Sequence, residues 1–272
     1  MPNHSPYRAL AFDLDGTLLV GEQLPPANRD ALRAVRDAGY RIIIATARWK
    51  EAALAIAAQA GVEDPVIACS GAQVHDPGLG ADVFDERLPA EFAQALYALC
   101  NQERCIATVT VGERVWIKLD GEPDPALITP PMRWTPRLEL SGNDLPRIAA
   151  VQGSRVGARI RGELQERFSD KVNVFDSVGP TGKVILTITA KNATKGAALH
   201  AACAHLGIPP SAAVAFGDAE NDLAMFAAAG AAVAMGQASA AVKAAATYVS
   251  RPHDQGGVAH AIEILLERGR LP

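Results

Sequence analysis

Five short apolar runs limit the fold of this chain more than any other feature. Each is rich in Ala, Val or Ile and stays apolar at nearly every position; the runs are residues 7–13, 40–46, 65–70, 212–217 and 231–235. Strands that alternate apolar and polar residues have one face in water, whereas unbroken apolar runs are typical of parallel strands covered by helices on both faces. The runs therefore predict a doubly wound, Rossmann-like α/β core with a parallel sheet.

The segments between these runs have the spacing of helices. Leu32, Val35 and Ala38 recur at helical intervals, and Gly39 follows them where a helix C-cap is expected. Residues 50–61 repeat this arrangement and end at Gly61. These two helices are predicted at residues 26–39 and 50–61, and further helices at residues 194–207, 221–230 and 238–246.

The strand–helix alternation stops near residue 80 and resumes near residue 190. Between these points we predict a helix at 88–102, two strands within 105–120 that turn at Gly112, and a proline-rich irregular connection over 121–146. A strand at 147–153, a helix at 154–168 and strands at 171–177 and 183–189 follow. The sequence thus predicts a core domain in two parts, 1–83 and 191–272, with an inserted α+β domain at 84–190.

Charge and hydropathy exclude two classes of partner. The net charge is −4, so the chain lacks the excess of basic residues that nucleic-acid binding requires. No apolar segment approaches the roughly 20 residues that span a bilayer. The start, MPNHSPYR, lacks the long apolar stretch of a secretion signal. We expect a cytoplasmic protein that binds neither nucleic acid nor a membrane, and the sequence does not predict its oligomeric state.

The four cysteines have no spacing that predicts a metal site. They form no Cys-x-x-Cys pair and no Cys/His cluster. Reduced thiols are expected in a cytoplasmic protein. A disulfide between Cys100 and Cys105 stays open because the two residues are close in sequence.

Polar side chains stand at the ends of several predicted strands. Asp13 and Asp15 follow the first run, Thr46 ends the second, and Asp218 follows residues 212–217. The carboxyl ends of parallel strands meet at one edge, where open α/β sheets bind ligands. Several carboxylates gathered there need a cation, and Mg²⁺ is the usual choice for phosphate chemistry. Lys195 can supply a second positive charge.

Each of these residues also has a structural alternative. Asp15 and the following glycine could simply form a turn, and Thr46 could be a helix N-cap. Asp222 could be a first-turn acid favoured by the helix dipole, and Lys195 could be a solvated surface lysine. Their occurrence together at strand ends, in this order, favours a functional site.

The complete set carries a family resemblance. Asp13-x-Asp15-Gly16-Thr17, Thr46-Ala47-Arg48, Lys195-Gly196 and Gly217-Asp218-x-x-Asn221-Asp222 resemble the motifs of the haloacid dehalogenase-like superfamily of phosphohydrolases. The large insertion is similar to that of the Cof-type branch. This resemblance implies that the inserted α+β domain acts as a cap over the strand ends.

The resemblance also implies a role for each residue of the set. Asp13 would be the nucleophile that forms an aspartyl-phosphate, and Asp15 the general acid and then the base. Mg²⁺ would be held by the Asp13 side chain, the Asp15 backbone carbonyl and Asp218. Asp222 would orient Lys195 or a metal-bound water. Phosphoryl oxygens would be held by the Leu14 and Ala47 backbone N–H groups, the Thr46 hydroxyl, Lys195 and Asn221.

Two positions depart from the family pattern. Ala47 stands where glycine is common, and Ser70 stands where asparagine is expected, which puts its contacts with the leaving group in doubt. Substrate contacts are assigned to Arg48, Ser70, Arg155 and Arg159. For Arg155 and Arg159 the alternative is a solvated basic helix face.

The predicted function is Mg²⁺-dependent hydrolysis of small phosphorylated metabolites, such as sugar phosphates, through an aspartyl-phosphate intermediate. A sugar phosphomutase would use the same nucleophile and acid, and remains an alternative. A non-catalytic module that binds phosphorylated ligands is a further one. It is disfavoured because binding alone needs neither a nucleophile nor an acid.

Overall fold

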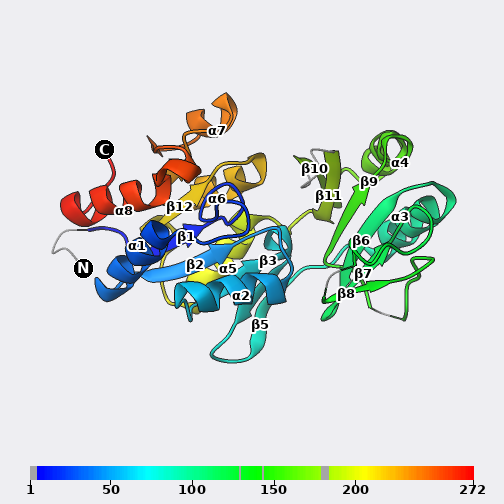
Figure 1. Ribbon diagram of the computed structural model, residues 1–272, viewed down its shortest axis with the longest axis horizontal. Coiled ribbons are helices and arrows are strands. Elements are labelled where there is room, and N and C mark those ends of the chain that lie inside the picture. Colours follow the sequence, from blue (N-terminus) through cyan, green and yellow to red (C-terminus); the bar gives the residue numbers. More distant parts are fainter. Residues whose placement is uncertain (1–4, 129, 143, 179–183) are drawn as a thin grey trace. The chain divides into compact units, whose positions relative to one another are not determined.

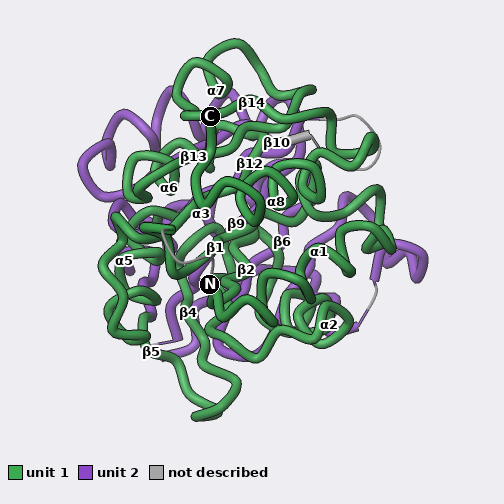
Figure 2. Tube along the Cα trace, turned by 90° about the vertical axis from the view of Figure 1, so that its left-hand side faces the viewer, with its two compact units in different colours: residues 1–84, 194–272 green, residues 85–193 purple. Residues whose placement is uncertain are grey.

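The computed structural model describes residues 5–128, 130–142, 144–178 and 184–272, and its chain divides into two compact units. One unit contains residues 1–84 and 194–272, and the other contains residues 85–193 (Figure 2). The second unit is therefore an insertion into the first.

The first unit is built on an eight-stranded sheet in which β1 is central. The order is β14-β13-β12-β1-β2-β3-β4-β5, and the first five neighbouring pairs are parallel whereas β3 and β4 are antiparallel. Figure 1 labels the strands β12, β1, β2 and β3 in the middle of this sheet. The strands are β1 (Ala9–Phe12), β2 (Arg41–Ala45), β3 (Val66–Ala68), β4 (Gln73–Asp76), β5 (Ala81–Asp85), β12 (Ala213–Gly217), β13 (Ala231–Ala234) and β14 (Tyr248–Val249).

Helices connect these strands and bury their apolar residues on the sheet. The α-helices are α1 (Pro26–Asp37), α2 (Lys50–Ala60), α5 (Lys195–His205), α6 (Leu223–Ala228), α7 (Ala240–Ala244) and α8 (Gly257–Arg268). Short 3₁₀ turns are η1 (Cys69–Gly71), η3 (Pro210–Ala212), η4 (Glu220–Asp222) and η5 (His253–Gln255). Leu199 of α5, Met225 of α6 and Val242 of α7 form one core with strand residues such as Ala11 and Ile43.

Every side chain of β1 is fully buried, as expected of a strand with covered faces on both sides. Alternation places Ala9 and Ala11 on the face that meets α5, and Leu10 and Phe12 on the other. Phe12 stacks on Phe216 of β12 with ring centroids 4.5 Å apart. This packing fixes the register of the two strands next to the site.

The second unit is an α+β sandwich with its own core. Its six-stranded sheet has the order β10-β11-β9-β6-β7-β8, and Phe92 and Val156 belong to the core that covers one face. The strands are β6 (Ile106–Val111), β7 (Arg114–Lys118), β8 (Met132–Trp134), β9 (Ile148–Gln152), β10 (Val172–Val178) and β11 (Val184–Ala190). The helices are α3 (Ala90–Gln102) and α4 (Ser154–Arg159), which continues as the π-helix η2 (Ile160–Gln165).

The predicted fold class, a parallel α/β core with an inserted α+β unit, is confirmed. Five local features differ from the prediction. Strands β4 and β5 extend the core sheet after β3, and strand β14 extends it beyond β13. Strand β8 lies within the segment 121–146 predicted to be irregular, η2 replaces the second half of a regular helix, and α8 covers a segment for which no helix was predicted. Among the described residues, no helix has the length and apolarity needed to cross a membrane.

Candidate active site

The site lies at the carboxyl edge of the parallel strands. Phe12 pairs with Ile44 on one side and with Phe216 on the other, so the three strands end level with one another. Asp13 directly follows β1, and its backbone N–H donates to the Phe216 carbonyl at 2.9 Å. Thr46 and Asp218 each follow the neighbouring strands closely, which brings the polar residues predicted for this edge together.

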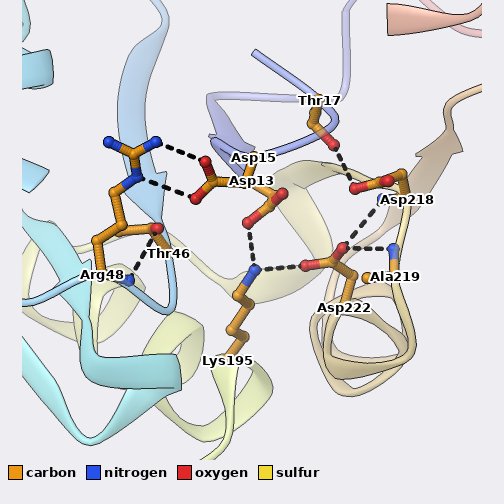
Figure 3. Close-up of polar contacts among 9 residues, drawn as sticks. All are labelled: Asp13, Asp15, Thr17, Thr46, Arg48, Lys195, Asp218, Ala219 and Asp222. Carbon is orange, nitrogen blue, oxygen red and sulfur yellow. Dashed lines mark hydrogen bonds and ion pairs between the residues drawn. The ribbon is translucent and has the colours of Figure 1, made fainter. Parts of the chain in front are cut away.

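Lys195 is buried at this edge of the sheet and contacts the carboxylates of Asp13 and Asp222. Its Nζ atom lies 2.5 Å from Oδ1 of Asp13 and 2.6 Å from Oδ1 of Asp222 (Figure 3). Lys195 is 1% exposed and Asp222 is fully buried, so the alternative of a solvated surface lysine is wrong. Lys195 starts α5, whose N-cap Thr194 accepts a hydrogen bond from Ala197 N at 3.1 Å and so fixes where the lysine emerges.

Asp222 also orders the loop that carries Asp218. Its second oxygen, Oδ2, accepts hydrogen bonds from the backbone N–H groups of Asp218 and Ala219, both at 3.0 Å. A Cβ atom on Gly217 would lie 2.5 Å from Oδ2 of Asp222, so only glycine permits this approach. Asp222 thus contacts Lys195 through Oδ1 and the backbone of Asp218 and Ala219 through Oδ2. One carboxylate therefore links the lysine motif to the motif that contains Asp218.

Asp218 is held by side chains from two other segments. Thr17 Oγ1 donates to Oδ1 of Asp218 at 3.2 Å, and Gln237 Nε2 donates to Oδ2 at 3.2 Å and to the Gly16 carbonyl at 2.6 Å. Gly16 has φ +82°, and a Cβ there would lie 2.4 Å from Oδ2 of Asp218. The glycine of the first motif thus makes room for this carboxylate.

The buried charges at this edge do not balance. One carboxylate oxygen from each of Asp13, Asp218 and Asp222 lies within 4.8 Å of the others, and Lys195 is the ammonium group that neutralises them in part. Burial raises the pKa of Asp13 well above its usual range, and the charges of Asp222 and Asp218 add to the effect while Lys195 opposes it. Burial also raises the pKa of Asp218, and Asp222 reinforces this.

Burial acts on the pKa of Lys195 in the opposite direction, yet that pKa is also raised. Burial alone would lower the pKa of Lys195, but Asp13 and Asp222 more than offset burial and hold that pKa above its usual value. The cluster therefore lacks positive charge and offers oxygen ligands. Hard divalent cations such as Mg²⁺ prefer this donor set, so the residues present fit such an ion.

Arg48 engages Asp15 through two nitrogens. Nη2 lies 2.6 Å from Oδ1 of Asp15 and Nε lies 3.0 Å from Oδ2, while Nη1 lies 2.7 Å from Glu22 Oε2. The Asp15 side chain is 53% exposed, in contrast to that of Asp13. The hydrogen bond to Asp15 is the largest cause of a raised pKa at Arg48, so the guanidinium stays charged. The two aspartates of one motif thus have different surroundings.

The loop after β2 positions Thr46 and Ala47. Thr46 is fully buried, and its Oγ1 accepts a hydrogen bond from Arg48 N at 3.1 Å; helix α2 has Trp49 rather than Thr46 as its N-cap. Ala47 is exposed. Among non-glycine residues of the described chain, positive φ angles occur at Cys69 and Ser70, so Ala47 does not need glycine's conformational freedom.

Ser70 occupies a left-handed backbone conformation with φ 56° and ψ 28°. Asn is favoured there over most residues, which explains physically why serine is a departure at this position. Its N–H donates to the Thr46 carbonyl at 3.0 Å, and its Oγ is buried with no hydrogen-bond partner among the described residues. The loops after β2 and β3 are therefore tied together.

Leu14 and Asn221 are the remaining residues of the first unit that were predicted to bind phosphate. Leu14 is fully buried, and its carbonyl accepts hydrogen bonds from Thr17 N and Leu19 N at 3.2 and 2.9 Å. Asn221 lies in η4 beside Asp222, and its Oδ1 is buried without a partner in the described part of the chain. Their roles in phosphate binding stay predictions.

Arg155 and Arg159 belong to α4 in the inserted unit, where they form ion pairs within that unit. Their guanidinium groups lie 3.2 and 3.0 Å from the carboxylate of Glu103, and Arg159 also pairs with Glu163 at 2.7 Å. These pairs occupy the charges that were assigned to substrate, and a role in substrate binding stays a prediction.

Two residues that contact the site were not predicted from the sequence. Gln237 holds Asp218 and Gly16, and Glu22 holds Arg48. Gln237 follows β13 by three residues, so the strand-end argument applied to Thr46 and Asp218 would have found it. Glu22 lies in a loop after β1 and carries no comparable signal.

Comparison with known proteins identifies the family over nearly the whole chain. A family model for haloacid dehalogenase-like hydrolases matches residues 10–262. The chain is 27% identical to phosphatase YwpJ of Bacillus subtilis (strain 168), with 95% of this chain and 100% of that protein covered. It is 29% identical to the 5-amino-6-(5-phospho-D-ribitylamino)uracil phosphatase YcsE of the same organism, with 94% of each covered.

The structural comparison agrees in fold. A haloacid dehalogenase-like hydrolase from B. subtilis superposes with a TM-score of 0.80 at 24% identity, covering 95% of this chain and 99% of the other. Because the family model covers far more than half of the sequence, this chain belongs to the haloacid dehalogenase-like hydrolase family.

Proposed function

We propose that this protein is a Mg²⁺-dependent phosphomonoesterase that hydrolyses small phosphorylated metabolites, such as sugar phosphates, through an aspartyl-phosphate on Asp13. The observation that carries the proposal is the state of Asp13. It is 5% exposed, stands at the ligand-binding edge of the sheet, and has its Oδ1 2.5 Å from the ammonium group of Lys195. Lys195 opposes the effect of burial on Asp13 and so favours its charged form, which is the form that attacks phosphorus.

Asp13 and Asp15 have surroundings that suit different roles. Burial raises the pKa of Asp13, and the Lys195 contact acts against burial in favour of the charged, nucleophilic form. Asp15 lies two residues later with its side chain half exposed, and we assign to it the proton given to the leaving oxygen and the proton later taken from water. Phosphoryl oxygens are assigned to the Thr46 hydroxyl, the backbone N–H groups of Leu14 and Ala47, Lys195 and Asn221.

The metal assignment rests on the charge imbalance of the edge. Mg²⁺, when bound by the carboxylates of Asp13 and Asp218 and the Asp15 carbonyl, supplies positive charge that reduces the repulsion between Asp13 and a phosphate dianion. Asp222 accepts from the loop of Asp218 and contacts Lys195, so we assign it a positioning role.

The substrate class is supported by relatives. The name of YcsE states that it dephosphorylates 5-amino-6-(5-phospho-D-ribitylamino)uracil, a small phosphate ester, and this chain matches that protein over 94% of its length. We extend the class, small phosphorylated metabolites, to this protein, and leave the individual substrate to a screen.

The test measures inorganic phosphate released from p-nitrophenyl phosphate and from a panel of phosphorylated metabolites. Asp13→Asn should lower kcat by about 10³-fold or more without changing the circular dichroism spectrum. Asp30→Asn makes the same chemical change at an exposed position of α1, with 70% of its side chain accessible, and should keep wild-type activity. Excess chelator should abolish turnover and added Mg²⁺ should restore it.

Three results contradict parts of the proposal separately. Wild-type-like turnover by Asp13→Asn excludes the aspartyl-phosphate. Full activity in chelator excludes the metal requirement. Formation of an isomeric sugar phosphate without phosphate release identifies a mutase in place of a hydrolase.

A further inference from the structure

The inserted unit contains two neighbouring cysteines that the proposed hydrolysis does not use. Cys100 lies near the end of α3 and Cys105 directly precedes β6; they are 0% and 2% exposed and do not form a disulfide. When Cys105 is neutral, its thiol donates to the Cys100 carbonyl, with Sγ and O 3.5 Å apart. The chain turns after Gln102, where α3 ends, and places Cys105 against the carbonyl of Cys100.

A buried lysine lies on the other side of Cys105. Lys118 of β7 is 8% exposed, and its Nζ atom lies 3.9 Å from Sγ of Cys105. Within the described part of the chain, no carboxylate forms an ion pair with Lys118. The nearby Asp120 and Glu103 pair with arginines instead. A buried ammonium group without an anionic partner is costly, and the Cys105 thiolate is the group placed to relieve that cost.

The ionisation of the two thiols is asymmetric. The hydrogen bond from Cys100 lowers the pKa of Cys105, burial opposes this, and the charge of Lys118 adds to the lowering, so the pKa lies below its usual value. The same hydrogen bond and burial raise the pKa of Cys100. Cys203, buried in the core unit, instead has its pKa raised to about 11 by burial. A thiolate beside a thiol is the arrangement of reactive dithiols.

A cavity of about 590 Å³ within the inserted unit reaches Cys105. Its wall includes Arg104, Gly153 and Arg161, and Cys105 lies among these residues. Because the residue is only 2% exposed, the approach to sulfur admits a small molecule more readily than a bulky reagent.

We propose that Cys105 is an oxidation site for small hydroperoxides and that Cys100 resolves the oxidised form to a Cys100–Cys105 disulfide. The Cys105 thiolate attacks one peroxide oxygen, an S–O bond forms, the O–O bond breaks, and the other oxygen leaves and takes up a proton as water or an alcohol. Cys100 then loses its proton and attacks the sulfenic sulfur, so that an S–S bond forms and the S–O oxygen leaves as water. Two electrons pass from the two sulfurs to the peroxide.

The experiment treats the folded, full-length protein with hydrogen peroxide, blocks remaining thiols and maps tryptic peptides without reduction. Trypsin cleaves at Arg87, Arg104 and Arg114, so the disulfide joins peptides 88–104 and 105–114, which are otherwise separate. Measured before the thiols are blocked, the intact mass should fall by about 2 Da, since two hydrogens are lost, and a reductant should reverse the change. Cys203 serves as the internal control and should stay reduced over the same period.

Variants separate the steps. Cys100→Ser should stop at the sulfenic acid, which dimedone traps on Cys105, and Cys105→Ser should abolish the linked peptide. Lys118→Met should slow oxidation about tenfold, because the thiolate fraction falls, whereas Lys118→Arg should keep the rate. Lys171→Met changes an exposed lysine of the same unit and should have no effect.

Two results overturn the proposal. One is the absence of the linked peptide from native wild-type protein that forms it when unfolded. The other is oxidation of Cys203 as fast as of Cys105. The wild-type map decides the question even if a cysteine variant fails to fold, and it is independent of phosphatase activity.

Discussion

The Nζ atom of Lys195 lies 2.5 Å from Oδ1 of Asp13, although 182 positions separate the two residues in sequence. The same nitrogen lies 2.6 Å from Asp222. An ammonium group shared by two carboxylates and shut off from water makes the stability of each charge depend on the others. The site is therefore also a structural joint between the first and last thirds of the chain.

Replacing Lys195 by Met should destabilise the protein by about 3–5 kcal/mol, because it leaves two buried carboxylates without their partner. Urea unfolding at neutral pH measures the change. Lys171→Met removes an exposed lysine that lies 3.8 Å from Glu91, and should cost only about 0–1 kcal/mol. If both variants lower the free energy of unfolding by the same amount, the buried Lys195 contacts contribute no more to stability than an exposed ion pair.

Replacing Gly16 by Ala should reduce kcat/KM for p-nitrophenyl phosphate by about tenfold or more, because the new methyl would overlap Asp218. It should also raise the Mg²⁺ concentration that gives half-maximal activity, since Asp218 is a proposed ligand. Gly21→Ala is the matched control, because Gly21 also has positive φ, +59°, but has no atom within 4 Å of the added Cβ. If both variants retain full activity, the close approach to Asp218 is not needed.

Arg48→Lys should lower kcat about tenfold, because an ammonium group cannot reproduce the two-point contact that orients Asp15. Glu22→Gln leaves that contact in place and should change kcat by less than about twofold. Steady-state kinetics with separate kcat and KM values makes the comparison. An effect confined to KM in Arg48→Lys would assign the arginine to substrate binding alone.

Asp85 should make stability depend on pH in the acidic range. Burial by itself would raise the pKa of Asp85, but hydrogen bonds from Arg147 and Arg87 outweigh burial and leave the pKa below its usual value. The stabilisation is therefore complete above the unfolded pKa of about 3.9 and is lost as the pH falls through the folded pKa. Urea midpoints measured from about pH 6 to pH 3 should fall less steeply in Asp85→Asn than in wild type. Asp30→Asn, at an exposed position, should leave the slope unchanged.

Sequence patterns predicted the strand edge well because its geometry follows from local rules. Once β1, β2 and β12 are parallel, Asp13, Thr46 and Asp218 must gather at one edge. The burial of Lys195 could not be derived in the same way. It depends on where α5 begins relative to two distant loops, which no local periodicity encodes.

Several short features that were not predicted share one cause: their structure is set by tertiary contacts. Strand β8 has three residues and lies in a proline-rich stretch, and only its pairing with β7 makes it a strand. Glu22 gains its contact with Arg48 because two loops meet, and Ser70 takes a left-handed conformation that serine does not prefer by itself. Patterns of two or three residues are too short to carry such information.

The position of β1 in the sheet determines how late in synthesis the site can form. Strand β1, which Asp13 directly follows, is synthesised first, yet its neighbour β12 is synthesised after the whole inserted unit. The inserted unit is one continuous stretch and can fold while the core still waits for its second half. The residues of the site therefore come together only when the ribosome has passed Asp222, and a nascent chain has no complete site before that point.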